Sequence, residues 1–103
     1  MNIIKIEELE KTQNPHGVDV RKVFENKSIG VMHIILKPGE ELVKHHNPVN
    51  AFFFVLEGSG LVEIGDEKQK VTRNTLIEVP ADKARGWKND SNELLKILVI
   101  KIL

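Results

Sequence analysis

The amino-acid sequence predicts an all-β protein, a single domain folded as one compact β-barrel. Short runs rich in Val, Ile and Phe recur along the 103 residues, with Gly, Pro and Asn between them about every 6–12 positions. Almost no segment has the spacing of apolar residues that an amphipathic helix needs. The length fits one domain with one modest core, and no repeat, linker or low-complexity segment divides it.

The N-terminal third is predicted to contain three strands and one turn of helix. The elements are a strand formed by Ile3, Ile4 and Ile6, a helical turn over residues 7–11, a loop over residues 14–17 that carries His16, and strands over residues 18–24 and 28–37. Arg21 and Lys22 are expected to face outward. His33 lies opposite a uniformly apolar strand face, so we expect it on the outer surface or at an interface, with its hydrogen bond satisfied.

The central stretch is the most informative part of the sequence. A turn at Pro38-Gly39 leads into a short strand that ends in the paired histidines His45 and His46. After a corner at Asn47-Pro48, the apolar run over residues 51–56 predicts a strand buried on both faces. The pattern indicates a site on the inner wall of a barrel.

The remaining residues predict four further strands and one segment around Trp87. The elements are a hairpin of residues 61–64 and 69–72 around Gly65, a strand over residues 75–79 closed by Pro80, a turn over residues 89–92, and a long last strand over residues 93–103.

Composition excludes several classes of function. Fifteen basic and fifteen acidic residues cancel, which argues against nucleic acid as a partner. The absence of cysteine excludes disulfides, thiolate nucleophiles and zinc-thiolate sites. The N-terminal residues carry charges where a signal peptide needs its apolar stretch, so we expect none, and no apolar run approaches the roughly 18 residues of a membrane span. We expect a cytoplasmic protein with no membrane partner.

The central stretch and the residues after it resemble the cupin superfamily, small β-barrels of the jelly-roll type. In the first cupin motif five residues separate a glycine from a His-x-His pair, and another glycine closes the motif; Gly39, His45 and Gly58 match it here. Pro80 and Asn89 match the second motif, whereas Asn74 and Asp82 stand where the motif has glycines. The resemblance covers roughly residues 28–102 and implies a jelly-roll barrel over residues 28–103, with residues 1–27 packing on that barrel or on a dimer partner.

The departures from the cupin motifs concern the metal ligands. Metal-binding cupins hold the ion with two histidines, a glutamate and a third histidine. The resemblance places His45, Asn47, Ala51 and Arg85 at these four positions. Because a mononuclear site generally needs three good protein ligands, we expect no cofactor. The alternative of a divalent transition metal held by His45 with or without His46 remains open.

Arg85 leads to the most specific hypothesis about the site. A guanidinium carries a fixed positive charge and a fork of donors suited to carboxylate or phosphate. A pocket formed by Arg85, His45, Asn47 and Asn50 would therefore favour a small anionic or oxygen-rich ligand. Two aromatic residues, Phe53 and Trp87, would form its wall. The opposing interpretation, in which the Arg85 side chain extends into solvent, also remains open.

Three functional interpretations follow. The first is a cupin that binds a small ligand without metal, and the second is a metal-dependent cupin oxygenase or isomerase with a rearranged ligand set. The third is a structural or interaction module with a decayed site. The sequence does not decide whether the protein is an enzyme, because no triad is present and only His45 offers general acid–base catalysis. The resemblance also implies a homodimer, formed through outer sheet faces and terminal strands.

Overall fold

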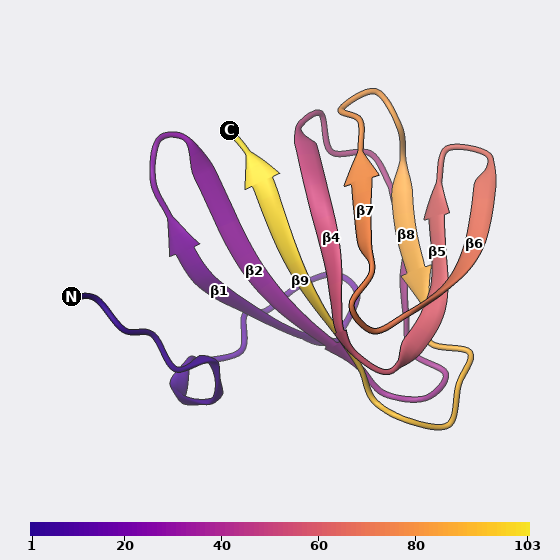
Figure 1. Ribbon diagram of the computed structural model, residues 1–103, viewed down its shortest axis with the longest axis horizontal. Coiled ribbons are helices and arrows are strands. Elements are labelled where there is room, and N and C mark those ends of the chain that lie inside the picture. The colour runs from indigo at the N-terminus through magenta and orange to yellow at the C-terminus, as the bar shows by residue number, and fades with distance from the viewer.

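The computed structural model describes all residues 1–103 and consists of nine strands and one short 3-10 turn (Figure 1). The elements are the 3-10 turn Ile6–Glu8 and the strands β1 (Asp19–Glu25), β2 (Ile29–Leu36), β3 (Glu41–His45), β4 (Asn50–Glu57), β5 (Ser59–Ile64), β6 (Glu67–Thr72), β7 (Leu76–Val79), β8 (Arg85–Lys88) and β9 (Leu95–Ile102). The all-β prediction is confirmed, and so is the hairpin around Gly65. No helix is long and apolar enough to cross a membrane.

The strands form two antiparallel sheets. The first has five strands in the order β1-β2-β9-β4-β7, and the second has four in the order β3-β8-β5-β6. Apart from the hairpins β1–β2 and β5–β6, successive strands lie in different sheets, and β8 of the second sheet lies between β3 and β5. This is a jelly-roll arrangement, in which the two sheets face each other without closing into one continuous cylinder.

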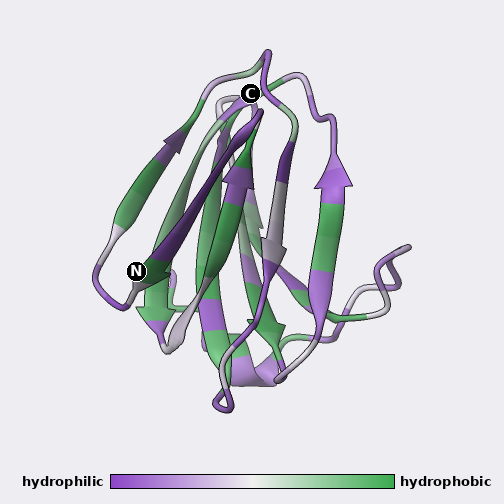
Figure 2. Cartoon of the chain, turned by 90° about the vertical axis from the view of Figure 1, so that its right-hand side faces the viewer, coloured by the Kyte–Doolittle hydropathy of each residue, from purple (hydrophilic) through white to green (hydrophobic).

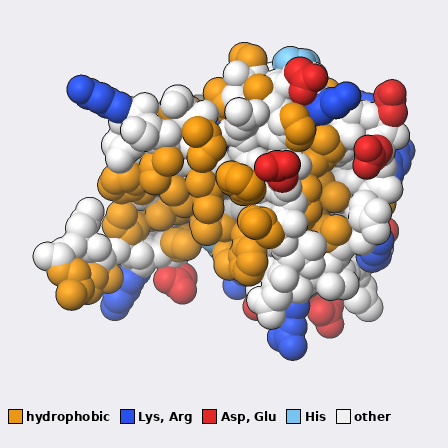
Figure 3. Space-filling model, turned by 45° about the horizontal axis from the view of Figure 1, so that its top comes forward, with side chains coloured by type: hydrophobic (Ala, Val, Ile, Leu, Met, Phe, Trp, Pro, Cys, Tyr) orange, Lys and Arg blue, Asp and Glu red, His pale blue; other side chains and the backbone are white.

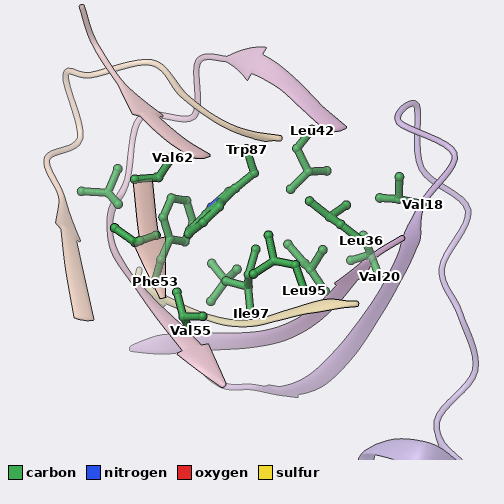
Figure 4. Close-up of a cluster of buried hydrophobic side chains, with 14 of the residues drawn as sticks. Val18, Val20, Leu36, Leu42, Phe53, Val55, Val62, Trp87, Leu95 and Ile97 are labelled. Atoms are coloured by element: carbon green, nitrogen blue, oxygen red, sulfur yellow. The ribbon is translucent and has the colours of Figure 1, made fainter. Parts of the chain in front are cut away.

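The core lies between the two sheets and follows from strand alternation. Leu36, Val55, Leu95 and Ile97 are completely buried. Figure 4 shows these side chains directed into the space between the sheets, with Phe53 and Trp87 at its centre, and Figure 2 shows hydrophobic stretches along the strands and hydrophilic loops between them. The edge of one aromatic ring meets the face of the other, with centroids 5.4 Å apart, a favoured geometry for such pairs.

The predicted N-terminal strand is wrong. Residues 1–5 pair with no strand, and Ile3 is 73% exposed. The helical turn forms earlier than expected, over Ile6–Glu8, and the side chain of Arg21 holds it by donating from Nη1 to the carbonyls of Ile6 and Glu7, both at 3.1 Å. Apolar residues alone do not make a strand, because a strand also needs a neighbour with free backbone groups.

The sequence predicted that the apolar run in β4 is buried on both faces, and this prediction is wrong. Ala51, Phe53 and Val55 point into the core, whereas Phe52 and Phe54 lie partly exposed on the outer face of the five-stranded sheet. No layer of this chain covers that outer face over β4. The run is therefore an alternating strand in which both faces carry apolar residues.

Lys22 also differs from the prediction, because it lies on the inward-facing row of β1, two residues after the buried Val20 and in register with Met32 on β2. There it borders the open end of the space between the sheets, with its side chain 57% exposed. Arg21 takes the outer face, as alternation requires. Adjacent strand residues cannot share a face, so Arg21 and Lys22 could not both point outward.

Candidate functional site

A cavity of about 520 Å³ opens between the two sheets at one end of the jelly roll. Its walls are the inner faces of β1, β2, β4 and β9 on one side and of β3 and β8 on the other, and the loop over residues 12–16 crosses its mouth. Five of the six residues predicted from the sequence to bind a ligand line this cavity: His45, Asn47, Phe53, Arg85 and Trp87.

Asn50 does not line this cavity. Its side-chain oxygen accepts a hydrogen bond from the backbone N–H of Ala81 at 2.8 Å, and it borders a shallow depression beside β7. In this position Asn50 joins the start of β4 to the loop between β7 and β8.

A bulge in β3 and a glycine in β8 determine which side chains face the cavity from the second sheet. Leu42 pairs with Trp87 and His45 pairs with Arg85, with a register shift between the two pairs. A Cβ atom on Gly86 would lie 2.8 Å from the carbonyl oxygen of Leu42. Because Gly86 has none, the bulged strand can approach β8 closely, and Leu42 and His45 both line the cavity despite being three positions apart.

Arg85 is only 4% exposed, so its side chain does not extend into solvent. It donates to three backbone carbonyls: from Nη1 to Val49 at 3.0 Å, from Nη2 to Pro80 at 3.0 Å, and to Lys83 from Nη2 at 2.9 Å and Nε at 3.2 Å. A guanidinium has five N–H groups, so one Nη1 hydrogen has no partner within the protein. Burial lowers the pKa of Arg85.

No carboxylate forms an ion pair with Arg85. The positive charge is balanced only by the dipoles of the carbonyl groups. The cavity therefore has a fixed cation in its wall without a counter-ion from the chain.

Two histidines meet at the mouth of the cavity. The ring of His45 lies 5.2 Å from that of His16, centroid to centroid, and its Nδ1 is 3.0 Å from the carbonyl oxygen of Val43. Partial burial lowers the pKa of His16, and the charge of His45 lowers it further. His46 is exposed and lines no part of this cavity. His16 lies in a loop, as predicted, but no local sequence pattern reveals that it packs on His45.

Sequence reasoning missed two lysines in the cavity wall. Lys22 lines it from β1, where its Nζ lies 3.1 Å from the carboxylate of Glu25. Lys101 lines it from β9 and lies in register between Gly30 and Ala51. Alternation along β9 could have located Lys101, because Ile97 and Val99 on the same face are core residues.

The residues present do not fit the metal site of the cupin family. Ala51 offers no donor atom, Arg85 is a cation held by carbonyl groups, and Asn47 is a poor ligand for transition metals. Nowhere do three His, Asp or Glu side chains gather closely enough to hold an ion.

His33 lies on the outer face of β2, as predicted, but it is buried and its Nδ1 has no hydrogen-bond partner. The expected satisfied hydrogen bond is absent at that nitrogen. Burial lowers the pKa of His33; the charges of Lys96 and Arg21 act in the same direction, while Asp19 and Glu7 oppose them.

This lowered pKa predicts that the protein is less stable in acid. The unfolded chain binds the His33 proton more tightly, so the stabilisation is complete above the ordinary pKa of 6.5 and is lost as pH falls through the lower folded-state pKa. We expect urea midpoints to fall from about pH 7.5 to about pH 5.5, with His16 contributing in the same direction. His33→Leu should reduce this dependence without loss of stability near neutral pH, whereas exposed His46→Leu should leave it unchanged. An equal pH dependence in wild type and His33→Leu would contradict the assignment.

Solved structures with the same fold include the protein TT1209 from Thermus thermophilus, with 24% identity and a TM-score of 0.83 over 99% of this chain and 97% of that chain. A predicted oxalate decarboxylase from Thermotoga maritima has 18% identity and a TM-score of 0.87 over 99% of both chains. The polyketide cyclase RemF from Streptomyces resistomycificus has 16% identity and a TM-score of 0.86 over 99% of this chain and 79% of that chain. At these identities the likeness shows the fold alone. No curated protein matches the chain in sequence.

The family comparison covers most of the strands described above. The sequence pattern of the family described as "Cupin domain" matches residues 32–101, from β2 to the end of β9, which is well over half of the chain. This match and the jelly-roll architecture agree, and the chain belongs to the cupin family.

Proposed function

We propose that this cupin domain binds a small anionic or oxygen-rich organic ligand in the cavity between its sheets, without the metal ion of metal-binding cupins. The observation that carries the proposal is the buried Arg85 guanidinium, which lines the cavity and has no carboxylate partner. Burying an unpaired charge is costly, and the carbonyl groups around Arg85 offset only part of that cost. An anion that accepts a hydrogen bond from the remaining Nη1 hydrogen would neutralise the buried charge of Arg85.

The neighbouring residues support the same interpretation. Asn47 and His45 border the cavity near Arg85 and offer an amide and an imidazole for hydrogen bonds to oxygen atoms. Phe53 and Trp87 provide an apolar wall that favours an organic ligand over a hydrated inorganic ion. His45 is the one side chain in this group suited to proton transfer near neutral pH. A cytoplasmic setting stays a prediction.

A thermal-shift screen at constant ionic strength tests the proposal. The anions are phosphate, sulfate, small sugar acids, and oxalate, which is included because a structural neighbour is described as a predicted oxalate decarboxylase. We expect at least one anion to raise the melting temperature in proportion to the logarithm of its concentration. Asn47→Ala and His45→Gln should reduce this rise, whereas Asn50→Ala, outside the cavity, should keep it. No shift with any anion would contradict binding and favour a decayed site.

Elemental analysis of protein purified without chelator separates the proposal from the metal-dependent alternative. The proposal requires metal well below one equivalent. One equivalent of a transition metal that is lost in His45→Ala would instead support an enzyme with a rearranged ligand set.

We also propose a homodimer formed through the outer face of the five-stranded sheet. That face has no covering layer over its centre, and apolar residues occupy it in adjacent strands: Val31, Phe52, Phe54, Leu76, Leu98 and Ile100. Figure 3 shows hydrophobic side chains gathered in a broad band across the molecule and again on the protruding N-terminal segment. Exposed apolar areas of this kind mark association surfaces, and a twofold pair of identical faces is the commonest way to cover one.

Sedimentation velocity tests the dimer. Leu76 on edge strand β7 is 59% exposed and lies on the proposed interface, while Val43 on edge strand β3 of the other sheet is 62% exposed. We expect the wild type to be a dimer. The dimer dissociation constant of the Leu76→Lys variant should be at least tenfold higher, because a lysine buried in the interface would have no partner. Val43→Lys should remain dimeric. A monomeric wild type, or equal effects of both variants, would exclude this interface.

A further inference from the structure

The cavity has two chemically different regions. Cationic side chains are found towards its mouth: Lys101 lies on the last inward-facing row of β9, Lys22 lies one row deeper on β1, where it pairs with the cavity-lining Glu25, and Arg85 lies at the start of β8. Deeper in the cavity the lining is apolar and comes from both sheets: Ile34, Leu42, Phe53, Trp87 and Val99. A ligand that fits both regions must be charged at one end and apolar along its body.

Lys101 is the cation best placed to receive such a ligand. Its neighbours in register are the two smallest residue types, Gly30 on β2 and Ala51 on β4, so neither adjacent strand covers its side chain. A Cβ atom on Gly30 would lie 3.9 Å from the Cβ of Lys101 and 3.7 Å from a carboxylate oxygen of Glu25. Glu25 itself pairs with Lys22. Lys101 forms no ion pair and remains half-buried in the cavity wall.

Ala51 is a second reason to expect a negatively charged ligand beside Lys101. The resemblance places it where metal-binding cupins have a glutamate, and its neighbour in register, Lys101, lines the cavity. The chain thus has a cation beside the position of the family's anionic ligand, and a second cation, Arg85, at the position of a family histidine. Both changes favour a negative charge in the bound molecule rather than in the protein.

Trp87 supplies an independent observation in the apolar region. The residue is 2% exposed and lines the cavity, and its indole Nε1 is buried without a hydrogen-bond partner. A buried N–H without a partner is rare because it loses its hydrogen bond to water. An oxygen atom on a ligand would supply the missing acceptor, and the adjacent ring of Phe53 favours an aromatic body beside it.

We propose that the ligand is an aromatic carboxylate, which pairs through its carboxylate with Lys101 and Arg85, packs its ring against Phe53 and Trp87, and carries a distal oxygen that accepts a hydrogen bond from Trp87 Nε1. The inference rests on the proposed anion-binding function and specifies its ligand class. An inorganic anion would balance the cations but would leave the apolar lining and the indole N–H unmatched. A neutral aromatic molecule would leave both cations unpaired.

The test uses 4-hydroxyphenylacetate as the probe, with three analogues that each lack one feature. Phenylacetate lacks the distal oxygen, 2-(4-hydroxyphenyl)ethanol lacks the charge, and oxalate lacks the ring. Trp87 is the only tryptophan and the chain has no tyrosine, so the protein's intrinsic fluorescence reports on this one side chain. Isothermal titration calorimetry gives the dissociation constants, and the indole N–H resonance in ¹⁵N NMR spectra reports directly on the hydrogen bond to Nε1.

We expect the complete probe to bind most tightly, to perturb Trp87 fluorescence and to shift the indole N–H resonance. Each analogue should bind at least about tenfold more weakly, since each loses one interaction. The Lys101→Gln variant should bind the complete probe more weakly by a similar factor. Lys96→Gln is the matched control, because Lys96 lies on the same strand but faces outward, where it pairs with Glu57 at 3.5 Å.

The outcomes distinguish this inference from the function on which it rests. If oxalate or phosphate binds as tightly as the probe and Trp87 does not respond, anion binding stands and the aromatic class is overturned. If no anion of either kind binds, the proposed function itself fails. Equal losses in Lys101→Gln and Lys96→Gln would overturn the role of Lys101.

Discussion

Replacement of Arg85 by methionine is expected to lower the free energy of unfolding by about 2–4 kcal/mol. The guanidinium makes four hydrogen bonds to the carbonyls of Val49, Pro80 and Lys83, which lie in the β3–β4 and β7–β8 loops. Methionine preserves the apolar stem of the side chain but is shorter than arginine and provides no donor. Because the loop residues are partly exposed, water can replace some of the lost hydrogen bonds. The decrease in the free energy of unfolding is therefore smaller than if all three carbonyl groups were left without a partner.

Equilibrium unfolding in urea measures this loss, and two further variants sharpen its interpretation. Arg85→Lys keeps the charge but cannot reach all three carbonyls with one ammonium group, so we expect about half of the loss. Arg73→Met removes an exposed arginine that makes no ion pair or side-chain hydrogen bond, and it should change stability by less than about 0.5 kcal/mol. Equal stabilities of Arg85→Met and Arg73→Met would show that the carbonyl contacts contribute nothing.

This structural role changes how ligand experiments must be designed. Loss of binding in an Arg85 variant could come from the missing charge or from the two loosened loops, since Arg85 joins both loops beside the cavity. Lys101 has no such contacts within the protein, so its substitution changes the charge of the cavity wall and little else. Ligand binding is therefore best tested with substitutions of Lys101, and the contribution of the carbonyl contacts to stability with substitutions of Arg85.

The fold was predictable because its determinants are local or match a known motif. Turn residues separated the strands β1 to β7 and β9 correctly, whereas β8 was expected only as a short segment around Trp87. The departures from the cupin motif did not change the predicted fold. Asn74, which stands where the motif has a glycine, adopts a φ of 62° and so supplies the left-handed conformation required there. Asparagine is one of the few other residues that tolerates this conformation.

The candidate site was less predictable because its contacts join distant parts of the chain. The motif alignment identified Arg85, but its carbonyl partners, which lie in two loops, have no sequence pattern. Similarly, nothing in the sequence around His16 indicates that it packs on His45. The bulge that places His45 beside Arg85 depends on close approach to Gly86, which only the folded structure reveals.

Asn89 carries the second large expected effect, and it shows that a motif residue can be structural. Its side chain is completely buried; Nδ2 donates to the carbonyls of Leu36 at 2.8 Å and Glu93 at 2.7 Å. Its Oδ1 accepts from the backbone N–H and the hydroxyl of Ser91 at 3.0 Å and 2.7 Å. Asn89 thereby connects the end of β2 to the turn that leads into β9, the central strand of the five-stranded sheet.

We expect Asn89→Ala to lower the free energy of unfolding by about 3–5 kcal/mol, because it leaves buried backbone groups unpaired and opens a small cavity. Asn89→Asp has almost the same shape but would direct a carboxylate oxygen at the carbonyls of Leu36 and Glu93, so it should be at least as destabilising near neutral pH and should recover partly in acid, when the carboxyl gains a proton to donate. Exposed Asn92→Ala, in the same turn, should cost less than about 0.5 kcal/mol. Urea unfolding at two pH values distinguishes these variants. If Asn89→Asp were as stable as wild type, the two donated hydrogen bonds could not be what holds this turn in place.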